Sequence, residues 1–179
     1  EFTSDRNCSY LDKQYMFGDS LLVAPIFNEH SIADYYLPEG KWTNFFTNEV
    51  YEGGKWVKES CGYLSIPLMV KPNSIVAIGS FENGPEYDYA DAVQLQIYEL
   101  DENSTASTLV CNMDSVTELT INATKNNNII SVQITTATDK PYTIRLINTK
   151  ALSVSDCEYT IDGSDTTIHT NGSKTIQIT

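Results

Sequence analysis

Polar and apolar side chains alternate along several short segments in the second half of the chain. Apolar residues recur there at every second position, with glutamine, serine, threonine or arginine between them. Because successive side chains of a β-strand point to opposite faces, each run predicts a strand with one buried and one exposed face. Turn formers separate these runs, so the second half predicts an antiparallel β-sandwich. The alternating segments are residues 93–97, 130–135, 142–146 and 176–178.

Aromatic residues and turn formers dominate the first eighty residues, which also predict strands. The strand expected at residues 35–37 runs into a turn at 38–41, and residues 42–46 are expected to form the return strand. Gly53 and Gly54 mark a second turn. This pattern predicts a second, smaller antiparallel body. The glycine, proline and polar residues of segment 79–86 mark the boundary between the two.

Residues 21–24 form a fully apolar run that ends at Pro25. A strand without polar alternation is typical of a parallel sheet that is covered on both faces, as in a barrel. Nothing else in the sequence predicts elements that cover both faces of a parallel sheet. We therefore expect this segment to belong to a larger structure.

Charge and composition exclude several classes of partner. The chain has 179 residues, of which 41% are hydrophobic, and its net charge is −13. A nucleic-acid backbone would be repelled by this charge, and an anionic membrane surface would be disfavoured as well. No apolar run approaches the roughly 18 residues of a transmembrane helix. We expect a globular chain with neither nucleic acid nor a membrane as its partner, while a homo-oligomer stays open.

The cysteines give no sign of a metal site. Cys8, Cys61, Cys111 and Cys157 lie about fifty residues apart, without CxxC spacing or a neighbouring histidine. We expect single thiols, and two disulfides are the alternative. The chain also has no GxGxxG or Walker motif, so neither a cofactor nor a metal is expected.

Four asparagines stand in Asn-x-Ser/Thr sequons: Asn7, Asn103, Asn122 and Asn171. These positions are candidate N-glycosylation sites only in a secretory setting. Because the chain is rich in asparagine, serine and threonine, several such matches are also expected by chance.

Asp19 is the most informative single carboxylate, because it directly precedes the apolar run, where a polar group must find hydrogen bonds. We interpret it as an orienting group at a barrel rim, with a turn aspartate as the alternative. His30 and His169 lie far apart without a nucleophile motif, so a catalytic dyad is not predicted. Asp88 and Asp91 lack the ligand spacing of an EF-hand and are expected on a solvated face rather than around calcium.

The aromatic residues Trp42, Phe45, Phe46 and Trp56 allow two interpretations. They could form a platform on which a sugar ring stacks. On alternating strands such residues more often belong to the core, which is the interpretation that we favour.

Five segments resemble glycoside hydrolase family 31. Residues 14–25 (QYMFGDSLLVAP) resemble the last barrel strand of that family, and residues 1–5 its EFPxD stretch, with Thr3 in place of proline. Residues 36–43 (YLPEGKWT) resemble its YLPEGxW hairpin, and residues 51–54 (YEGG) resemble the EGG turn that follows it. Residues 64–75 (LSIPLMVKPNSI) resemble the LSLPLxVRPNSI segment of the α-xylosidase branch more closely than the PLFVRAGSI segment of related α-glucosidases.

The resemblance implies a domain organisation and a parent activity. The fold it implies is mainly β, with proximal and distal antiparallel β-sandwiches after the last strand region of a TIM barrel. The ranges are 1–27 for the end of the (β/α)8 catalytic barrel, 28–80 for the proximal domain and 81–179 for the distal domain. The implied parent is a retaining α-xylosidase that acts on xylosides or xyloglucan oligosaccharides.

In this family both catalytic aspartates come from earlier barrel strands, so the resemblance assigns no catalytic or substrate-binding residue to this chain. The chain is then an accessory C-terminal part whose partner is the amino-terminal and catalytic-barrel part of the same enzyme. The alternatives are an α-glucosidase of the same family, or a stand-alone carbohydrate-binding module with Tyr87, Tyr89 and Tyr98 as stacking residues. The expected location is the cytoplasm.

Overall fold

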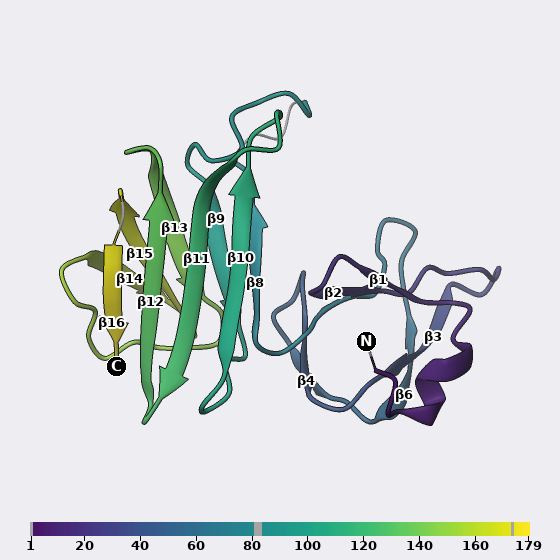
Figure 1. The fold of residues 1–179 in the computed structure, drawn as a ribbon. Helices are drawn as coiled ribbons and strands as arrows, with labels where there is room; N and C mark the ends of the chain where they lie inside the picture. Colours follow the sequence, from purple (N-terminus) through teal and green to yellow (C-terminus); the bar gives the residue numbers. More distant parts are fainter. Residues whose placement is uncertain (1, 81–83, 173) are drawn as a thin grey trace. The chain divides into compact units, whose positions relative to one another are not determined.

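A computed structural model describes residues 2–80, 84–172 and 174–179, which divide into two compact units, Glu1–Pro72 and Asn73–Thr179. Both units are built mainly from antiparallel strands, as the sequence predicted (Figure 1). The expected boundary near residue 80 adjoins residues 81–83, which lie outside the described residues. The division instead follows Pro72, because the strand expected at 75–78 pairs within the second unit.

The first unit contains one five-stranded sheet, in the order β1-β2-β7-β4-β5, and one two-stranded sheet, β3-β6 (Figure 1). Its elements in chain order are the 3₁₀ helix η1 (Arg6–Tyr10) and the strands β1 (Tyr15–Phe17), β2 (Leu21–Val23), β3 (Ile32–Leu37), β4 (Lys41–Asn44), β5 (Val50–Glu52), β6 (Lys55–Ser60) and β7 (Leu68–Val70).

The strand β2 corrects the expectation of a parallel barrel strand. It lies between β1 and β7 and pairs antiparallel with both, with Leu22 opposite Met16 on one side and Met69 on the other. Leu22 and Ala24 join the core of the first unit, while Val23 is only 8% exposed. The run is continuously apolar because β2 is an inner strand that the unit's own residues cover. Residues 1–27 therefore belong to the first unit.

The two turns that carry the YLPEG and EGG motifs lock together. Gly53 donates its N–H to the carbonyl of Gly40 at 2.8 Å, and the buried Trp42 donates its indole N–H to the carbonyl of Pro38 at 2.8 Å. A Cβ atom on Gly53 would lie 1.8 Å from the Pro38 oxygen, so only glycine fits there. The turn at 38–41 does not close the expected hairpin, because β3 pairs with β6 while β4 pairs with β5 and β7.

The second unit is a sandwich of two sheets that face each other (Figure 1). One sheet has the order β10-β11-β12-β16, and the other has the order β14-β15-β13-β9-β8. The strands are β8 (Ser74–Ile78), β9 (Gln94–Tyr98), β10 (Thr105–Cys111), β11 (Thr117–Asn126), β12 (Ile129–Thr136), β13 (Pro141–Leu146), β14 (Glu158–Asp162), β15 (Asp165–Asn171) and β16 (Lys174–Ile178).

The alternation predicted from the sequence builds the core of this sandwich. Leu95 and Ile144 from one sheet are fully buried, as are Ile121 and Val132 from the other, and all four join one apolar cluster. The four alternating segments all form strands, β9, β12, β13 and β16. A parallel pairing between β9 and β13 is the exception among otherwise antiparallel neighbours, and periodicity alone could not have revealed it.

Within the described residues, no helix has the length and apolar character needed to span a membrane.

The alternation makes a prediction about two leucines on neighbouring strands. Leu119 on β11 is 2% exposed, whereas Leu109 on β10 is 55% exposed. Truncation of a buried leucine removes its transfer free energy and leaves a cavity, so L119A should lower the free energy of unfolding by about 2–5 kcal/mol. The matched variant L109A should change it by about 0.5 kcal/mol or less. Urea unfolding of the 179-residue chain, followed by circular dichroism, measures both, and equal losses would contradict the assigned strand faces.

Candidate functional site

The amino-terminal segment is tied to β3 through Tyr36. The Tyr36 hydroxyl donates to the Asp5 carboxylate at 2.9 Å and accepts from the Asn7 amide at 3.2 Å. The hydrogen bond to Asp5 raises the pKa of Tyr36. The Gln14 side chain pairs with the backbone of Tyr36 in both directions, at 2.7 and 2.8 Å, as a neighbouring strand would. Asp5, within the stretch that resembles EFPxD, therefore has a structural contact that the sequence did not predict.

Asp19 lies exposed in the turn between β1 and β2, next to Gly18, which has a φ of +64°. The left-handed conformation of Gly18 closes this short hairpin. This position agrees with the alternative interpretation, in which Asp19 is a turn residue. An orienting role for Asp19 stays a prediction, and it now concerns a hairpin turn rather than the end of a parallel strand.

All four sequon asparagines have exposed side chains. Asn7 is in η1, Asn103 is in the turn before β10, Asn122 is on the exposed face of β11 and Asn171 ends β15. Ser173, the hydroxyl residue of the last sequon, lies outside the described residues. Accessibility is satisfied at each site, and glycosylation itself stays a prediction.

The thiols and imidazoles form no catalytic pair among the described residues. All four cysteines are free and partly buried, and burial is the main cause that raises the pKa of Cys8 and Cys61. His30 and His169 are both exposed, on different units. No group of three or more metal-ligating side chains occurs in the described part of the chain.

The aromatic candidates separate into core and surface residues. Trp42 is fully buried, as the core interpretation predicted, whereas Trp56 is 55% and Phe46 is 63% exposed. Tyr98, expected as an exposed stacking residue, is 1% exposed, and burial raises its pKa to about 12. Its hydroxyl donates to Gln96 at 2.5 Å, so it is not available to a ligand. The alternation of the sequence does not predict the burial of Tyr98, because Tyr98 lies on the same face of β9 as the polar residues Gln94 and Gln96.

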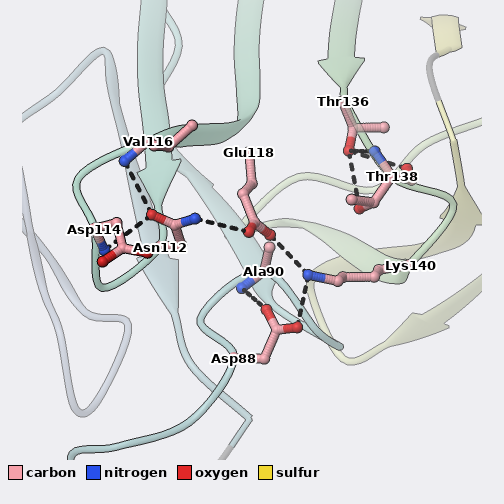
Figure 2. Close-up of polar contacts among 9 residues, drawn as sticks. All are labelled: Asp88, Ala90, Asn112, Asp114, Val116, Glu118, Thr136, Thr138 and Lys140. Atoms are coloured by element: carbon pink, nitrogen blue, oxygen red, sulfur yellow. Dashed lines mark hydrogen bonds and ion pairs between the residues drawn. The ribbon is translucent and has the colours of Figure 1, made fainter.

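A network around Lys140 joins three loops at one end of the second unit, as Figure 2 shows. The Lys140 ammonium contacts Asp88 at 2.6 Å and Glu118 at 2.7 Å. Glu118 also accepts from Asn112, whose side-chain oxygen binds the N–H groups of the loop before β11. Asp88 is exposed and paired with Lys140, which agrees with the solvated face expected from the sequence.

Asp88 and Glu118 do not meet the requirements of a glycosidase pair, although they share one ammonium. A retaining enzyme needs one carboxyl group that keeps its proton near neutral pH and another that acts as nucleophile. The hydrogen bond from Lys140 lowers the pKa of Asp88, which is the opposite of what a general acid requires. The arrangement tethers loops and assigns no catalytic residue.

A second ion pair, also not predicted from the sequence, fixes the loop after β13. Arg145 donates to one oxygen of Asp165 through two nitrogens, at 2.7 and 3.1 Å, while the Asn148 N–H donates to the other oxygen at 2.8 Å. Asp165 is 4% exposed, and these charge-assisted bonds compensate its burial. An Asp-Gly turn signal at 162–163 precedes it in the sequence, but no local pattern indicates its long-range partner.

The Lys140 network predicts a pH-dependent contribution to stability. A carboxylate with a lowered pKa stabilises the fold above its unfolded value of about 3.9, and this stabilisation is lost as the pH falls through the folded pKa. The hydrogen bonds to Asp88 and Glu118 raise the pKa of Lys140. The stabilisation of the fold by the Lys140 ammonium is therefore fully present below the unfolded pKa of about 10.4 and is lost as the pH rises through the folded pKa. K140M leaves two carboxylates without their cation, so its melting temperature should lie furthest below that of the wild type near neutral pH.

The difference in melting temperature should shrink as the pH falls from about 6 to about 3, since protonation removes the repulsion. The matched variant K150M changes an exposed lysine of the same unit that makes no ion pair with a described residue. Thermal unfolding of K140M, K150M and the wild type across this pH range measures the three melting temperatures. A deficit of K140M that is constant with pH would contradict the network.

Comparisons with known proteins match both units. The glycosyl hydrolase family 31 C-terminal domain matches residues 1–76, and the model described as alpha-xylosidase YicI, C-terminal domain, matches residues 88–179. Alpha-xylosidase XylQ of Lactiplantibacillus pentosus is 38% identical over 113 residues, which are 62% of this chain and 15% of that protein. An alpha-xylosidase of Emericella nidulans is 36% identical over 105 residues, which are 54% of this chain and 14% of that one.

Alpha-glucosidases also match, at 30–31% identity. A family 31 dextranase of Flavobacterium johnsoniae has the same fold, with a TM-score of 0.85 at 17% identity over 99% of this chain and 28% of that one. This chain thus spans a minor part of each of these relatives. It belongs to glycoside hydrolase family 31, of which it is an α-xylosidase-type C-terminal region.

Proposed function

We propose that the chain is the accessory C-terminal part of a retaining α-xylosidase and that it supports the catalytic barrel of that enzyme. The matches to α-xylosidases at 36–38% identity, against 30–31% for α-glucosidases, favour terminal α-xylosyl residues of xylosides or xyloglucan oligosaccharides as the substrate of the whole enzyme. The two catalytic carboxyl groups, about 5–5.5 Å apart in a retaining enzyme, come from the barrel.

The observation that carries the supporting role is an exposed apolar patch on the first unit, made by Phe46, Tyr63 and Leu64. Leu64 is 96% exposed, and Tyr63 is fully exposed beside it in a turn that Ser65 closes onto Gly62. Leu64 and Phe46 line the same cavity of about 220 Å³. Large apolar side chains held at defined turns are typical of an interaction surface.

The turn that holds Phe46 is itself well defined. The Asn44 side-chain oxygen accepts from the N–H groups of Phe46 and Thr47 at 2.9 and 3.1 Å, and Phe45 packs edge to face on Phe46 with ring centroids 5.4 Å apart. A side chain held in this way loses little conformational entropy on binding. We propose that the catalytic part of the same enzyme covers this patch.

We propose the cytoplasm as the location of the enzyme. Four free thiols suit a reducing compartment, where disulfides are rare. In that compartment the four sequons would carry no glycan.

The proposal predicts that the 179-residue chain alone does not hydrolyse p-nitrophenyl α-D-xylopyranoside. Release of nitrophenolate should stay at the rate of a buffer blank, because the nucleophile and the acid come from the barrel. The matched assay uses the same chain together with the separately produced barrel part, which should restore turnover. Robust turnover by the chain alone would refute the proposed division of roles.

A second prediction concerns the apolar patch. L64S should weaken association with the catalytic part about five- to thirtyfold, since truncation of a buried interface residue costs about 1–2 kcal/mol. The matched variant L152S changes a leucine of the second unit that is 86% exposed and should leave association unchanged. Titration calorimetry of each variant with the barrel part measures the dissociation constants. Equal affinities for L64S and the wild type would remove Leu64 from the interface.

A further inference from the structure

The two-stranded sheet of the first unit has an outer face that carries polar and aromatic side chains. On β3 and β6, Tyr36 lies opposite Trp56, and Asp34 lies opposite Lys58. Their neighbours Ala33, Tyr35 and Leu37 point the other way, into the core. The outer face therefore presents Asp34 and Trp56 at adjacent register positions.

The segment that follows η1 crosses this face and leaves a small hollow beside Trp56. Gln14 holds the segment in place through its two hydrogen bonds to the backbone of Tyr36. The hollow has a volume of about 160 Å³. It is lined by Tyr10, Leu11, Asp12, Lys13, Gln14, Asp34 and Trp56.

The indole of Trp56 is exposed but oriented. Its ring packs on Tyr36 at a centroid distance of 5.6 Å and an interplanar angle of 58°, while 55% of the residue stays exposed. The Tyr36 hydroxyl is in turn held by Asp5 and Asn7. Tyr10, at the end of η1, is 93% exposed on the border of the same hollow. The site thus offers a held aromatic surface with a second aromatic ring beside it.

The polar groups around the hollow are available to a ligand. Asp12, Lys13 and Asp34 are exposed, and their side chains have no hydrogen-bond or ion-pair partner among the described residues. Carboxylates accept hydrogen bonds from hydroxyl groups, and an ammonium donates to hydroxyl oxygens. Two carboxylates and one ammonium, on a chain of net charge −13, favour a neutral ligand over an anionic one.

We propose that this hollow is a surface site for one neutral pyranose unit. The C–H face of the sugar stacks on Trp56, its rim contacts Tyr10, and its hydroxyl groups bond to Asp12, Lys13 and Asp34. Sites for drug-sized ligands span about 300–1,000 Å³, so a hollow of about 160 Å³ holds one ring rather than a chain of sugars. The inference does not depend on the proposed hydrolytic function, because it concerns binding without bond cleavage and rests on these residues alone.

The test uses the 179-residue chain and methyl α-D-xylopyranoside, with the anionic methyl α-D-glucuronide as the comparison. The chain has two tryptophans, of which Trp42 is fully buried, so acrylamide quenching of fluorescence reports on Trp56. The neutral glycoside should protect this fluorescence from quenching in a saturable manner, with a dissociation constant on the order of millimolar. The anionic glycoside should bind at least several-fold more weakly. Quenching that is unaffected up to about 100 mM of the neutral glycoside would overturn the proposal.

Variants locate the site. By ligand-observed NMR, W56A and D34N should each weaken binding of the neutral glycoside about tenfold. The matched variant F27A removes an aromatic side chain that is 70% exposed elsewhere on the unit, and it should bind normally. W56F, which keeps a stacking ring, should recover most of the affinity, and far-UV circular dichroism of W56A checks that this variant is folded. Wild-type affinity in both W56A and D34N would place the sugar elsewhere and refute the site.

Discussion

Antiparallel pairing with a period of two along each strand is the constraint on which both units depend. Each strand turns one set of side chains into a core and the other set to the surface, so a single position decides between burial and exposure. The two tryptophans illustrate this. Trp42 on β4 points inward and gives its indole N–H to a buried carbonyl, whereas Trp56 on β6 points outward opposite Tyr36. The same residue type serves the core in one case and a surface in the other.

Because the inward positions of the strands are filled by apolar side chains, most polar and charged side chains lie on outer faces and in loops. Two groups of charged side chains hold loops in place there. Lys140 joins Asp88 to Glu118, and Arg145 joins Asp165 to the backbone of Asn148. The hydrogen bond from Lys140 lowers the pKa of Asp88, which suits a tether and not a proton donor.

Sequence reasoning succeeded where local periodicity decides the structure. The strands β9, β12, β13 and β16 follow from alternation, and the family resemblance follows from five segments, all within residues 1–76, which the family 31 C-terminal domain matches. It failed where two structures share one local pattern. The run at 21–24 has the continuous apolarity of a parallel barrel strand, but an inner antiparallel strand covered on both faces needs the same residues. Long-range partners, such as Asp165 for Arg145 or Tyr36 for Asp5, leave no local signal at all.

The candidate sites show the same difference between features that follow from local sequence and features that depend on long-range contacts. The EGG and YLPEG motifs can be recognised in the sequence, but the sequence does not show why glycine is needed. Gly53 is required because it lies against the Pro38 carbonyl, a contact that forms only in the folded chain. Trp42 and Trp56 cannot be told apart by sequence pattern, but the fold separates them. Trp42 on β4 is buried, whereas Trp56 on β6 lies opposite Tyr36 and is exposed. A motif therefore identifies the family from its spacing, whereas the surface that can bind a ligand depends on which residues pairing turns outward. In this chain that surface is made by the segment after η1 lying across β3 and β6, a juxtaposition of residues more than twenty positions apart.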